Sequence, residues 1–308
     1  MVRMGLIGVG KMGRYHLNLY DEITDVSLSA VCDSNKETLR TLAETKAVPG
    51  FENFRDIFPL VDAVTVATPT VFHYEIVRAC LKAGKHTLVE KPITTDYCQA
   101  EELFELAEKN NLILHIGYVE RFNPAVRKLK GIIGNPRLIE ARRAGPFNPN
   151  FKNDSVVMDI MIHDIDIVAA IAGGPVVAIQ AMGAPVYTKL ADYASVNIHF
   201  NNSIAAHVIA SRISPTKERF LNVTQDDKLI ALNYASQEIS VIGEGRSPRL
   251  LIEKGNPLKA EIKHFISCVE GKSGRMVSIE DELLSLRVAL EIDTLIKSDM
   301  YGCKELIW

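Results

Sequence analysis

The sequence predicts an α/β protein of two domains, a doubly wound parallel sheet followed by an α+β domain with an open, largely antiparallel sheet. Short apolar runs alternate with helical segments through the first 120 residues, and consecutive strand-like runs dominate after Arg121. The length of 308 residues matches about two average domains. Apolar residues make up 47% and charged residues 24% of the chain, which excludes a disordered or coiled-coil protein.

The first domain is expected to consist of repeated strand-helix-strand units. The runs typical of strands are residues 2–7, 26–31, 63–67, 87–89 and 112–116. The segments typical of helices are residues 11–20, 35–44, 71–81 and 97–109. Such units build a parallel sheet with helices on both faces, so we assign residues 1–120 to this domain.

The second domain, residues 121–308, is expected to form one broad sheet flanked by helices. Its predicted strands are residues 176–181, 194–200, 204–211, 219–224, 228–232 and 238–242. Its predicted helices are residues 124–130, 158–172, 257–270 and 279–298. Asn201-Asn202-Ser203 separates two alternating runs and is typical of a hairpin turn, which makes the sheet largely antiparallel.

Charge and hydropathy exclude several partners. The 35 Lys and Arg against 38 Asp and Glu leave a net charge of −3, which favours neither nucleic acid nor an anionic membrane. The longest apolar run, residues 167–179, is too short to span a bilayer. The N-terminal run leads into Gly8 without a signal-peptide cleavage site. We therefore expect a cytoplasmic protein without nucleic-acid or membrane partners.

The five cysteines have no C-x-x-C spacing, as is typical of a reducing compartment. They are Cys32, Cys80, Cys98, Cys268 and Cys303. We expect each to be a small buried apolar residue, and we expect no disulfide framework and no metal site.

A glycine-rich motif predicts a cofactor site near the N-terminus. Residues 8–13 read Gly8-Val9-Gly10-Lys11-Met12-Gly13, which fits G-x-G-x-x-G after a strand and at the start of a helix. In that context the glycines allow a tight turn, a close approach of the backbone to a pyrophosphate, and close packing of helix on strand. The phosphates would bind amide groups at the helix N-terminus.

Asp33 predicts which dinucleotide binds. It follows Gly13 by twenty residues at the end of the second predicted strand, where a carboxylate accepts hydrogen bonds from the adenine ribose and repels a 2′-phosphate. The next residues are Ser34 and Asn35, not arginine, so NAD is favoured over NADP. The alternative role for Asp33 is the N-cap of the following helix.

Two groups of polar residues are candidates for chemistry. Lys91, between Glu90 and Pro92, follows a predicted parallel strand at the end where open α/β sheets bind ligands. On an α-helix, Asp159, His163 and Asp166 would share one face, with Asp164 about a hundred degrees away from His163. The helical group could be a base oriented by carboxylates, a metal site or a solvated face, and the rest of the helix is too apolar for a surface helix.

Together these motifs identify a resemblance to the Gfo/Idh/MocA family of NAD(P)-dependent oxidoreductases over nearly the full length. The matching marks are Gly8, Gly10, Gly13, residues 90–92, residues 121–124, Asp159, His163, Asp166 and residues 256–258 with 264–266. The resemblance implies an N-terminal Rossmann domain, a C-terminal domain for substrate binding and oligomerisation, and a substrate held between them.

The resemblance also implies the roles of individual residues. His163 would remove a hydroxyl proton of a sugar while Lys91 hydrogen-bonds that oxygen, after a cis peptide bond before Pro92 has turned Lys91 toward the nicotinamide. Hydride would pass to the cofactor, and Asp159 would bind a neighbouring hydroxyl or orient His163. The expected cofactor contacts are Gly8, Gly10, Lys11, Met12, Gly13, Asp33, Thr68, Pro69, His73, Glu90 and Lys91.

Within the family the chain resembles the branch that acts on nucleotide sugars. Met161 and residues 155–157 stand where many members carry glycine, a departure that speaks against a free-monosaccharide pocket. The similarity is greatest to enzymes that oxidise the 3-hydroxyl of UDP-N-acetylglucosamine, whose 3-keto product is transaminated in making lipid A. Arg121, Arg142 or Arg143 could bind the substrate pyrophosphate, and the alternative is that they form ion pairs. The expected substrate contacts are Lys91, Arg121, Asn123, Arg143, Asp159 and His163.

The sequence leaves two alternative functions open and also predicts an oligomer. The substrate could instead be inositol, an aldose or a UDP-hexuronate, or the chain could be a sensor of NAD or sugar without catalysis. The presence of both Lys91 and His163 favours an enzyme. The apolar alternation of Val196, Ile198 and Phe200 needs a cover, from which we expect a homodimer or homotetramer. Residue 308, an aromatic Trp, could join that interface.

Overall fold

The computed structural model describes residues 1–149, 153–226, 228–243 and 248–301. The chain forms two compact units, each built from two segments of the sequence. The first unit comprises Met1–Val119 and Leu258–Ile279, and the second comprises Glu120–Pro257 and the chain from Glu280 onward. The chain passes from the first unit to the second between Val119 and Glu120, and segment 258–279 returns to the first unit.

The first unit is built on a parallel sheet. In the described residues this sheet has six strands in the order β3-β2-β1-β4-β5-β6, and every pair is parallel. The strands are β1 (Val2–Ile7), β2 (Val26–Cys32), β3 (Gly50–Phe51), β4 (Ala63–Val66), β5 (His86–Glu90) and β6 (Leu114–Gly117). The strand order reverses between β1 and β4, so their carboxyl ends mark the point where such sheets bind ligands. The Rossmann prediction is confirmed.

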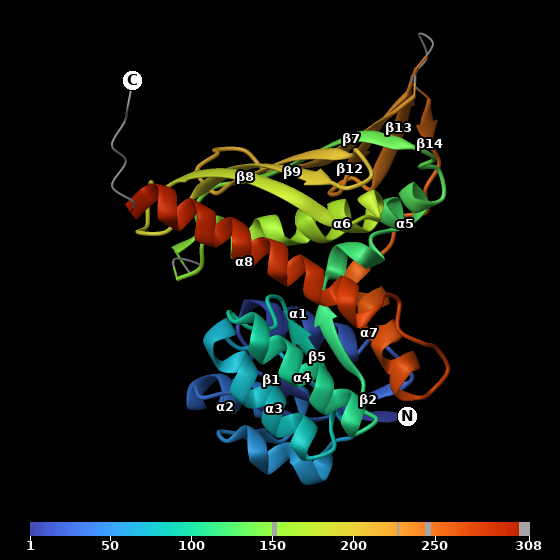
Figure 1. The fold of residues 1–308 in the computed structure, drawn as a ribbon. Helices are drawn as coiled ribbons and strands as arrows, with labels where there is room; N and C mark the ends of the chain where they lie inside the picture. The colour runs from blue at the N-terminus through green and yellow to red at the C-terminus, as the bar shows by residue number, and fades with distance from the viewer. Residues whose placement is uncertain (150–152, 227, 244–247, 302–308) are drawn as a thin grey trace. The chain divides into compact units, whose positions relative to one another are not determined.

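Helices connect these strands, and Figure 1 shows several of them packed along the sheet. They are α1 (Lys11–Tyr20), α2 (Lys36–Lys46), η1 (Phe54–Leu60), η2 (Thr70–Phe72), α3 (His73–Lys82), α4 (Tyr97–Lys109) and α7 (Pro257–Val269). Side-chain oxygens of Asn35 and Asp96 accept backbone amide hydrogen bonds and begin α2 and α4. The predicted and observed bounds of α1 and α4 are identical.

Helix α7 belongs to the first unit because of its apolar side. Its residues Ile262, Phe265 and Ile266 are buried in one cluster with Met4 of β1 and Leu88 of β5. Their spacing of three and one puts all three on one side of the helix. The sequence predicted this helix but not its return to the first unit, because periodicity shows which side is apolar and not what covers it.

The second unit contains a broad mixed sheet. In the described residues it has eight strands in the order β14-β13-β12-β11-β7-β10-β9-β8. They are β7 (Pro136–Ala144), β8 (Val176–Ala184), β9 (Tyr193–Phe200), β10 (Ala205–Ser211), β11 (Glu218–Gln225), β12 (Lys228–Asn233), β13 (Glu238–Ile242) and β14 (Arg249–Leu250). Strands β9 and β10 form the predicted hairpin around Asn202, and the β10–β7 pair is parallel while the other described pairs are antiparallel.

Strand β7 lies in the middle of this sheet, although the sequence did not indicate it. It starts at Pro136 and carries four charged residues among nine, a composition typical of a loop or an edge. The buried positions Ile139, Ala141 and Arg143 alternate as in a strand, but one of them is an arginine. The sequence therefore does not show β7 as an alternating strand, because the charge of Arg143 is neutralised only in the folded protein.

Helices cover one face of the second sheet. They are η3 (Val119–Phe122), α5 (Pro124–Lys130), the π-helical turn η5 (Val157–Met161), α6 (Ile162–Ala172) and α8 (Ile279–Tyr301). Figure 1 shows α6 and α8 along the same face. Val196, Ile198 and Phe200 are 1 to 3% exposed, so the chain itself buries the face that the sequence argument left for another subunit.

The cysteines correct one expectation. Cys32, Cys80 and Cys268 are buried, but Cys98 is exposed, because it lies in the solvated first turn of α4. Burial raises the pKa of Cys32 to about 12, which keeps this thiol protonated. Cys303 and Trp308 lie outside the described residues. Nowhere in the described chain is there a helix with the length and apolarity that a membrane span requires.

Candidate active site

The glycine-rich loop between β1 and α1 has the geometry of a phosphate cradle. Gly8 has a φ of +90°, and a Cβ there would lie 2.8 Å from the backbone of Ala67. A Cβ on Gly13 would lie 2.0 Å from the Gly8 carbonyl oxygen, so helix and loop touch at this point. A Cβ on Gly10 would meet no described heavy atom within 4 Å. Gly10 therefore leaves space at the surface, as a backbone that must approach a pyrophosphate does.

The N-terminus of α1 faces that space. Gly10 is the N-cap of the helix, with no side chain of the described residues as a cap, and the first turn contains no acidic residue. The amides of this turn, which includes Lys11 and Met12, and the helix dipole suit an anion. The residues present fit the diphosphate of a dinucleotide.

Replacing Gly10 with alanine is expected to lower NAD affinity about tenfold or more without changing stability. The φ of Gly10 is −67°, which alanine adopts readily, and the added methyl would occupy the open space. Fluorescence titration with NADH and thermal unfolding measure the two effects. Loss of the fold would show that Gly10 is required for packing and not for the cofactor.

Asp33 joins the end of β2 to the glycine-rich loop. Its Oδ2 accepts a hydrogen bond from the Val9 amide at 2.7 Å, and its Oδ1 accepts one from the Asn35 amide at 2.9 Å. The N-cap of α2 is Asn35, so the alternative capping role of Asp33 is wrong. The carboxylate lies where it can receive the hydroxyls of an adenine ribose.

His73 holds two chain segments beside the switch point. Its Nδ1 lies 2.8 Å from the carbonyl oxygen of Pro92 and its Nε2 lies 2.8 Å from that of Thr68, and the ring is 1% exposed. Pro69 begins the short turn η2 between these segments. His73 thus ties the Thr68-Pro69 turn to the Lys91-Pro92 turn.

Glu90 ends strand β5 at the carboxyl edge of the sheet, and Lys91 follows it. The Glu90 carboxylate is 8% exposed and lies 2.7 Å from Nε2 of the buried His16 in α1. The Lys91-Pro92 peptide bond is cis, as the family resemblance implies, and Lys91 is half-buried. His16 was not predicted, because no sequence spacing links a helix residue to a strand end seventy positions away.

In the second unit, a π-helical turn carries Asp159 and leads into α6, which carries His163. Both side chains are half-buried. A π-turn has more residues per turn than an α-helix, so the step from Asp159 to His163 is not the α-helical stack that the sequence predicted. Such turns frequently occur at functional sites.

Asp164 and Asp166 are both buried residues of α6, and each lies against a different arginine. Arg121 forms a bidentate ion pair with Asp166, with Nε–Oδ2 and Nη2–Oδ1 distances of 2.8 and 2.5 Å, and Ser285 also donates to Asp166. The carboxylate of Asp166 is thus committed to these partners, which separates it from the group that the sequence argument formed with His163.

Arg143 forms the second buried network. It donates to both oxygens of Asp164 at 2.8 and 2.9 Å and to Glu120 at 2.9 Å, and its guanidinium stacks on the Tyr234 ring. Burial opposes its charge, but the Asp164 and Glu120 carboxylates outweigh burial and raise the pKa of Arg143. Asn123 caps α5 and bonds Glu120 and the Tyr234 carbonyl. These contacts favour the ion-pair alternative over substrate contacts for this group.

Arg142 points to the other side of β7 and is about one-third exposed. Its Nε lies 2.7 Å from the Glu218 carboxylate on β11. The structure therefore places Arg121, Arg142 and Arg143 in ion pairs. Lys91 and the cofactor residues lie in the first unit, and Asp159, His163, Arg121, Asn123 and Arg143 lie in the second.

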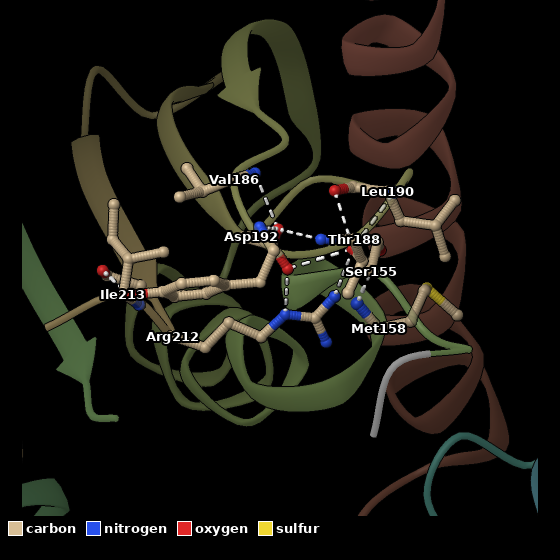
Figure 2. A network of polar contacts seen from close by, with 10 residues as sticks. Ser155, Met158, Val186, Thr188, Leu190, Asp192, Arg212 and Ile213 are labelled. Carbon is tan, nitrogen blue, oxygen red and sulfur yellow. Dashed lines mark hydrogen bonds and ion pairs between the residues drawn. The ribbon is translucent and has the colours of Figure 1, made fainter. Parts of the chain in front are cut away.

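A further network fixes the loop before β9, next to the start of η5 (Figure 2). Oδ2 of Asp192 accepts the backbone amides of residues 186–188, and its Oδ1 accepts Nε of Arg212 at 2.6 Å. The Ala191 carbonyl accepts a hydrogen bond from the Val156 amide, directly before the turn η5 that contains Asp159. The only sequence signal was an aspartate before a strand, which is too common to be specific.

Replacing Asp192 with asparagine is expected to cost about 2–4 kcal/mol of stability at pH 7. Although burial opposes its charge, three backbone amides and Arg212 hold the pKa of Asp192 at about 2, below its usual 3.8. The carboxylate therefore stabilises the fold fully above about pH 4 and loses this contribution as the pH falls toward 2. Urea unfolding from pH 2 to 7 measures it.

Asp62→Asn is the matched control for that experiment. Asp62 also pairs with an arginine, Arg3 at 2.6 Å, but its side chain is 42% exposed, so the expected cost is below about 1 kcal/mol. Equal losses in the two variants would contradict the assignment to the buried network.

The glycine cradle and the carboxylate at the β2 end define a protein that binds a dinucleotide, and the comparisons extend this class to NAD-binding oxidoreductases. Residues 2–118 match the family described as oxidoreductases with an NAD-binding Rossmann fold, and residues 127–246 match its C-terminal domain. The chain belongs to the GFO/IDH/MocA family of oxidoreductases. The NAD expectation and the family expectation are confirmed.

The chain is similar to sugar and inositol dehydrogenases. It is 31% identical to the UDP-N-acetylglucosamine 3-dehydrogenase of Acidithiobacillus ferrooxidans, over 94% of this chain and 97% of that protein. A solved structure of that enzyme matches with a TM-score of 0.91 at 30% identity, over 96% of this chain and 98% of that one. The scyllo-inositol 2-dehydrogenase (NAD(+)) of Bacillus subtilis is 25% identical over 94% of this chain and 92% of its own length.

Proposed function

We propose that this protein oxidises the 3-hydroxyl of UDP-N-acetylglucosamine to a ketone with NAD. The observation that carries the proposal is the full-length similarity to a UDP-N-acetylglucosamine 3-dehydrogenase, at higher identity than the full-length inositol relative. The presence of Lys91 and His163 supports the same chemistry. The 3-keto sugar formed is a substrate suited to transamination, as in the biosynthesis of lipid A.

His163 is the base in this proposal. Its imidazole accepts the proton of the reacting hydroxyl, while the Lys91 ammonium donates a hydrogen bond to the same oxygen and lowers the pKa of that hydroxyl. Asp159 accepts a hydrogen bond from a neighbouring hydroxyl or orients His163. When bound, NAD supplies the hydride acceptor, held by the glycine-rich loop and Asp33.

The ion pairs beneath α6 support the precision of this arrangement. Asp164 and Asp166 follow His163 by one and three residues on α6, and both are fixed by buried arginines. A helix anchored on both sides of its buried face holds the His163 ring in one direction, which general-base catalysis requires.

A panel of substrates tests the function against its alternatives. Purified protein is mixed with NAD and UDP-N-acetylglucosamine, UDP-glucuronate, myo-inositol or glucose, and NADH is followed at its absorbance. NADH from UDP-N-acetylglucosamine, with the sugar oxidised at C3, is the expected result. Reduction with inositol alone would select the inositol dehydrogenase alternative, and NAD binding without turnover on any compound would select a sensor.

We also propose a cytoplasmic homodimer or homotetramer. The outward side of the second sheet supports it through the exposed apolar residues Val177 and Met182 of β8, at 62 and 63% exposure. These replace Val196, Ile198 and Phe200 as the residues that need a cover. A monomeric mass in light scattering would contradict the assembly.

A further inference from the structure

Arg121, Arg142 and Arg143, the arginines considered for a substrate diphosphate, all form ion pairs with carboxylates of the second unit. Arg219 on β11 lies directly opposite Arg143 of β7 in the antiparallel register. Side chains opposite each other in such a pair lie on the same face of the sheet. Arg219 is thus on the side of the sheet that α6 covers.

Arg219 differs from Arg143 in its partners. Arg143 is 4% exposed and bonds two carboxylates, whereas Arg219 is exposed and has no side-chain hydrogen bond or ion pair with any residue that the structure describes. Partial burial and the charge of Arg143 lower the pKa of Arg219, against a smaller opposing effect of Glu120 and Asp164. The guanidinium therefore lies beside a second cation and forms no ion pair with the described chain.

A cavity of about 350 Å³ lies at this position. It is lined by Lys217, Glu218, Arg219, Phe220, Asn233 and Ala235. Lys217 precedes Arg219 by two residues and also has no side-chain ion pair with a described residue, while its stem packs near Gly145 at the end of β7. Glu218 carries the one carboxylate of the lining, and Arg142 neutralises it at 2.7 Å.

The cavity is close to the helix of the candidate base within the second unit. Arg219 lies opposite Arg143, Arg143 holds the carboxylate of Asp164, and Asp164 follows His163 in the chain. Arg219 is thus linked to the helix that carries His163 through one arginine and one carboxylate of the same unit.

We propose that Arg219 and Lys217 bind the diphosphate of the nucleotide-sugar substrate, an assignment that rests on the proposed function. A guanidinium makes two parallel hydrogen bonds to phosphate oxygens, and an ammonium adds a point charge. The two cations with no acidic partner in the described chain match an anionic ligand with charge on two neighbouring phosphates. The diphosphate in turn supplies the counterion for Arg219.

Binding of UDP tests this assignment without requiring turnover. Calorimetric titration of the NAD-loaded full-length protein with UDP is compared for wild type, Arg219→Gln, Lys217→Gln and Arg219→Lys. We expect about 10–100-fold weaker binding for Arg219→Gln, a smaller loss for Lys217→Gln, and partial recovery for Arg219→Lys. NAD affinity and thermal unfolding should not change in these variants.

Arg137→Gln is the matched control. Arg137 is an exposed arginine on β7, but it lies six residues from Arg143, about 20 Å along the strand. The Arg137→Gln variant should bind UDP as tightly as the wild type. UDP affinity equal to wild type in Arg219→Gln, equal losses in both arginine variants, or no UDP binding by the wild type would each overturn the assignment.

Kinetics separate this assignment from the proposed function. With UDP-N-acetylglucosamine, Arg219→Gln should raise KM about 10–100-fold and leave kcat within a few-fold. If UDP binding falls in the variant but no UDP-sugar reduces NAD in the wild type, the proposed function fails while the diphosphate site stands. If the wild type turns over UDP-N-acetylglucosamine and the variant keeps its KM, the site fails while the function stands.

Discussion

Replacing His163 with asparagine lowers kcat by about 10²–10⁴-fold and leaves NAD affinity unchanged. Asparagine retains hydrogen bonding at this position but cannot accept a proton near neutral pH, so the hydroxyl loses its base. The glycine-rich loop and Asp33 lie in the first unit, whereas His163 lies in the second, so the cofactor contacts are not altered. Steady-state NADH formation and NADH fluorescence titration measure the two quantities.

His199→Asn provides the matched control. His199 is an exposed histidine on β9, in the same unit as His163. The His199→Asn variant should keep the kcat of the wild type. If His163→Asn also keeps full activity, the assignment of the base is wrong, and if both variants lose activity equally, the loss comes from the unit's stability and not from proton transfer.

Arg143→Met destabilises the protein by about 3–5 kcal/mol. The substitution removes the cation between Asp164 and Glu120, and Asp164 is 0% exposed, so its carboxylate is left in the core without a charge partner. Urea unfolding measures the loss. The same substitution also distinguishes the two roles that the sequence left open for this arginine.

Arg142→Met is the internal comparison, since it changes the neighbouring arginine of the same strand. Its ion pair with Glu218 is about one-third exposed on both sides, so we expect a loss below about 1 kcal/mol. Should Arg143→Met keep wild-type stability and raise only the KM for a UDP-sugar, Arg143 would be a substrate contact and not a core residue.

The sequence predicted most elements because their patterns are local. The spacing of apolar residues defines α1, α4 and α5 to the residue, and the glycine motif requires a strand before it and a helix after it. Strand β7 could not be found in this way, because its inward arginine becomes compatible with a core only next to Asp164 and Glu120. The residues that make β7 compatible with the core lie 21 and 23 positions away in the sequence.

In the candidate site, too, the sequence predicted the residues of a local motif but not those that depend on tertiary contacts. Gly8 and Gly13 shape a backbone loop that the motif itself encodes, and the Asp33 carboxylate accepts the Val9 amide within that loop. The partners of Arg121 and Arg143 depend on which helix covers the sheet, so the sequence could not choose between ion pairs and a substrate contact. Arg219 carried no motif at all, and only its register with Arg143 identifies it.

The return of α7 to the first unit has a consequence for synthesis on the ribosome. The cluster around Met4 and Leu88 is not complete until Phe265 and its neighbours have left the exit tunnel. The nucleotide-binding unit therefore cannot finish folding vectorially from its own N-terminus, and its first 119 residues wait through the translation of the intervening segment 120–257. A nascent chain that stops before residue 258 leaves an unfinished apolar surface on that unit, a natural target for chaperones.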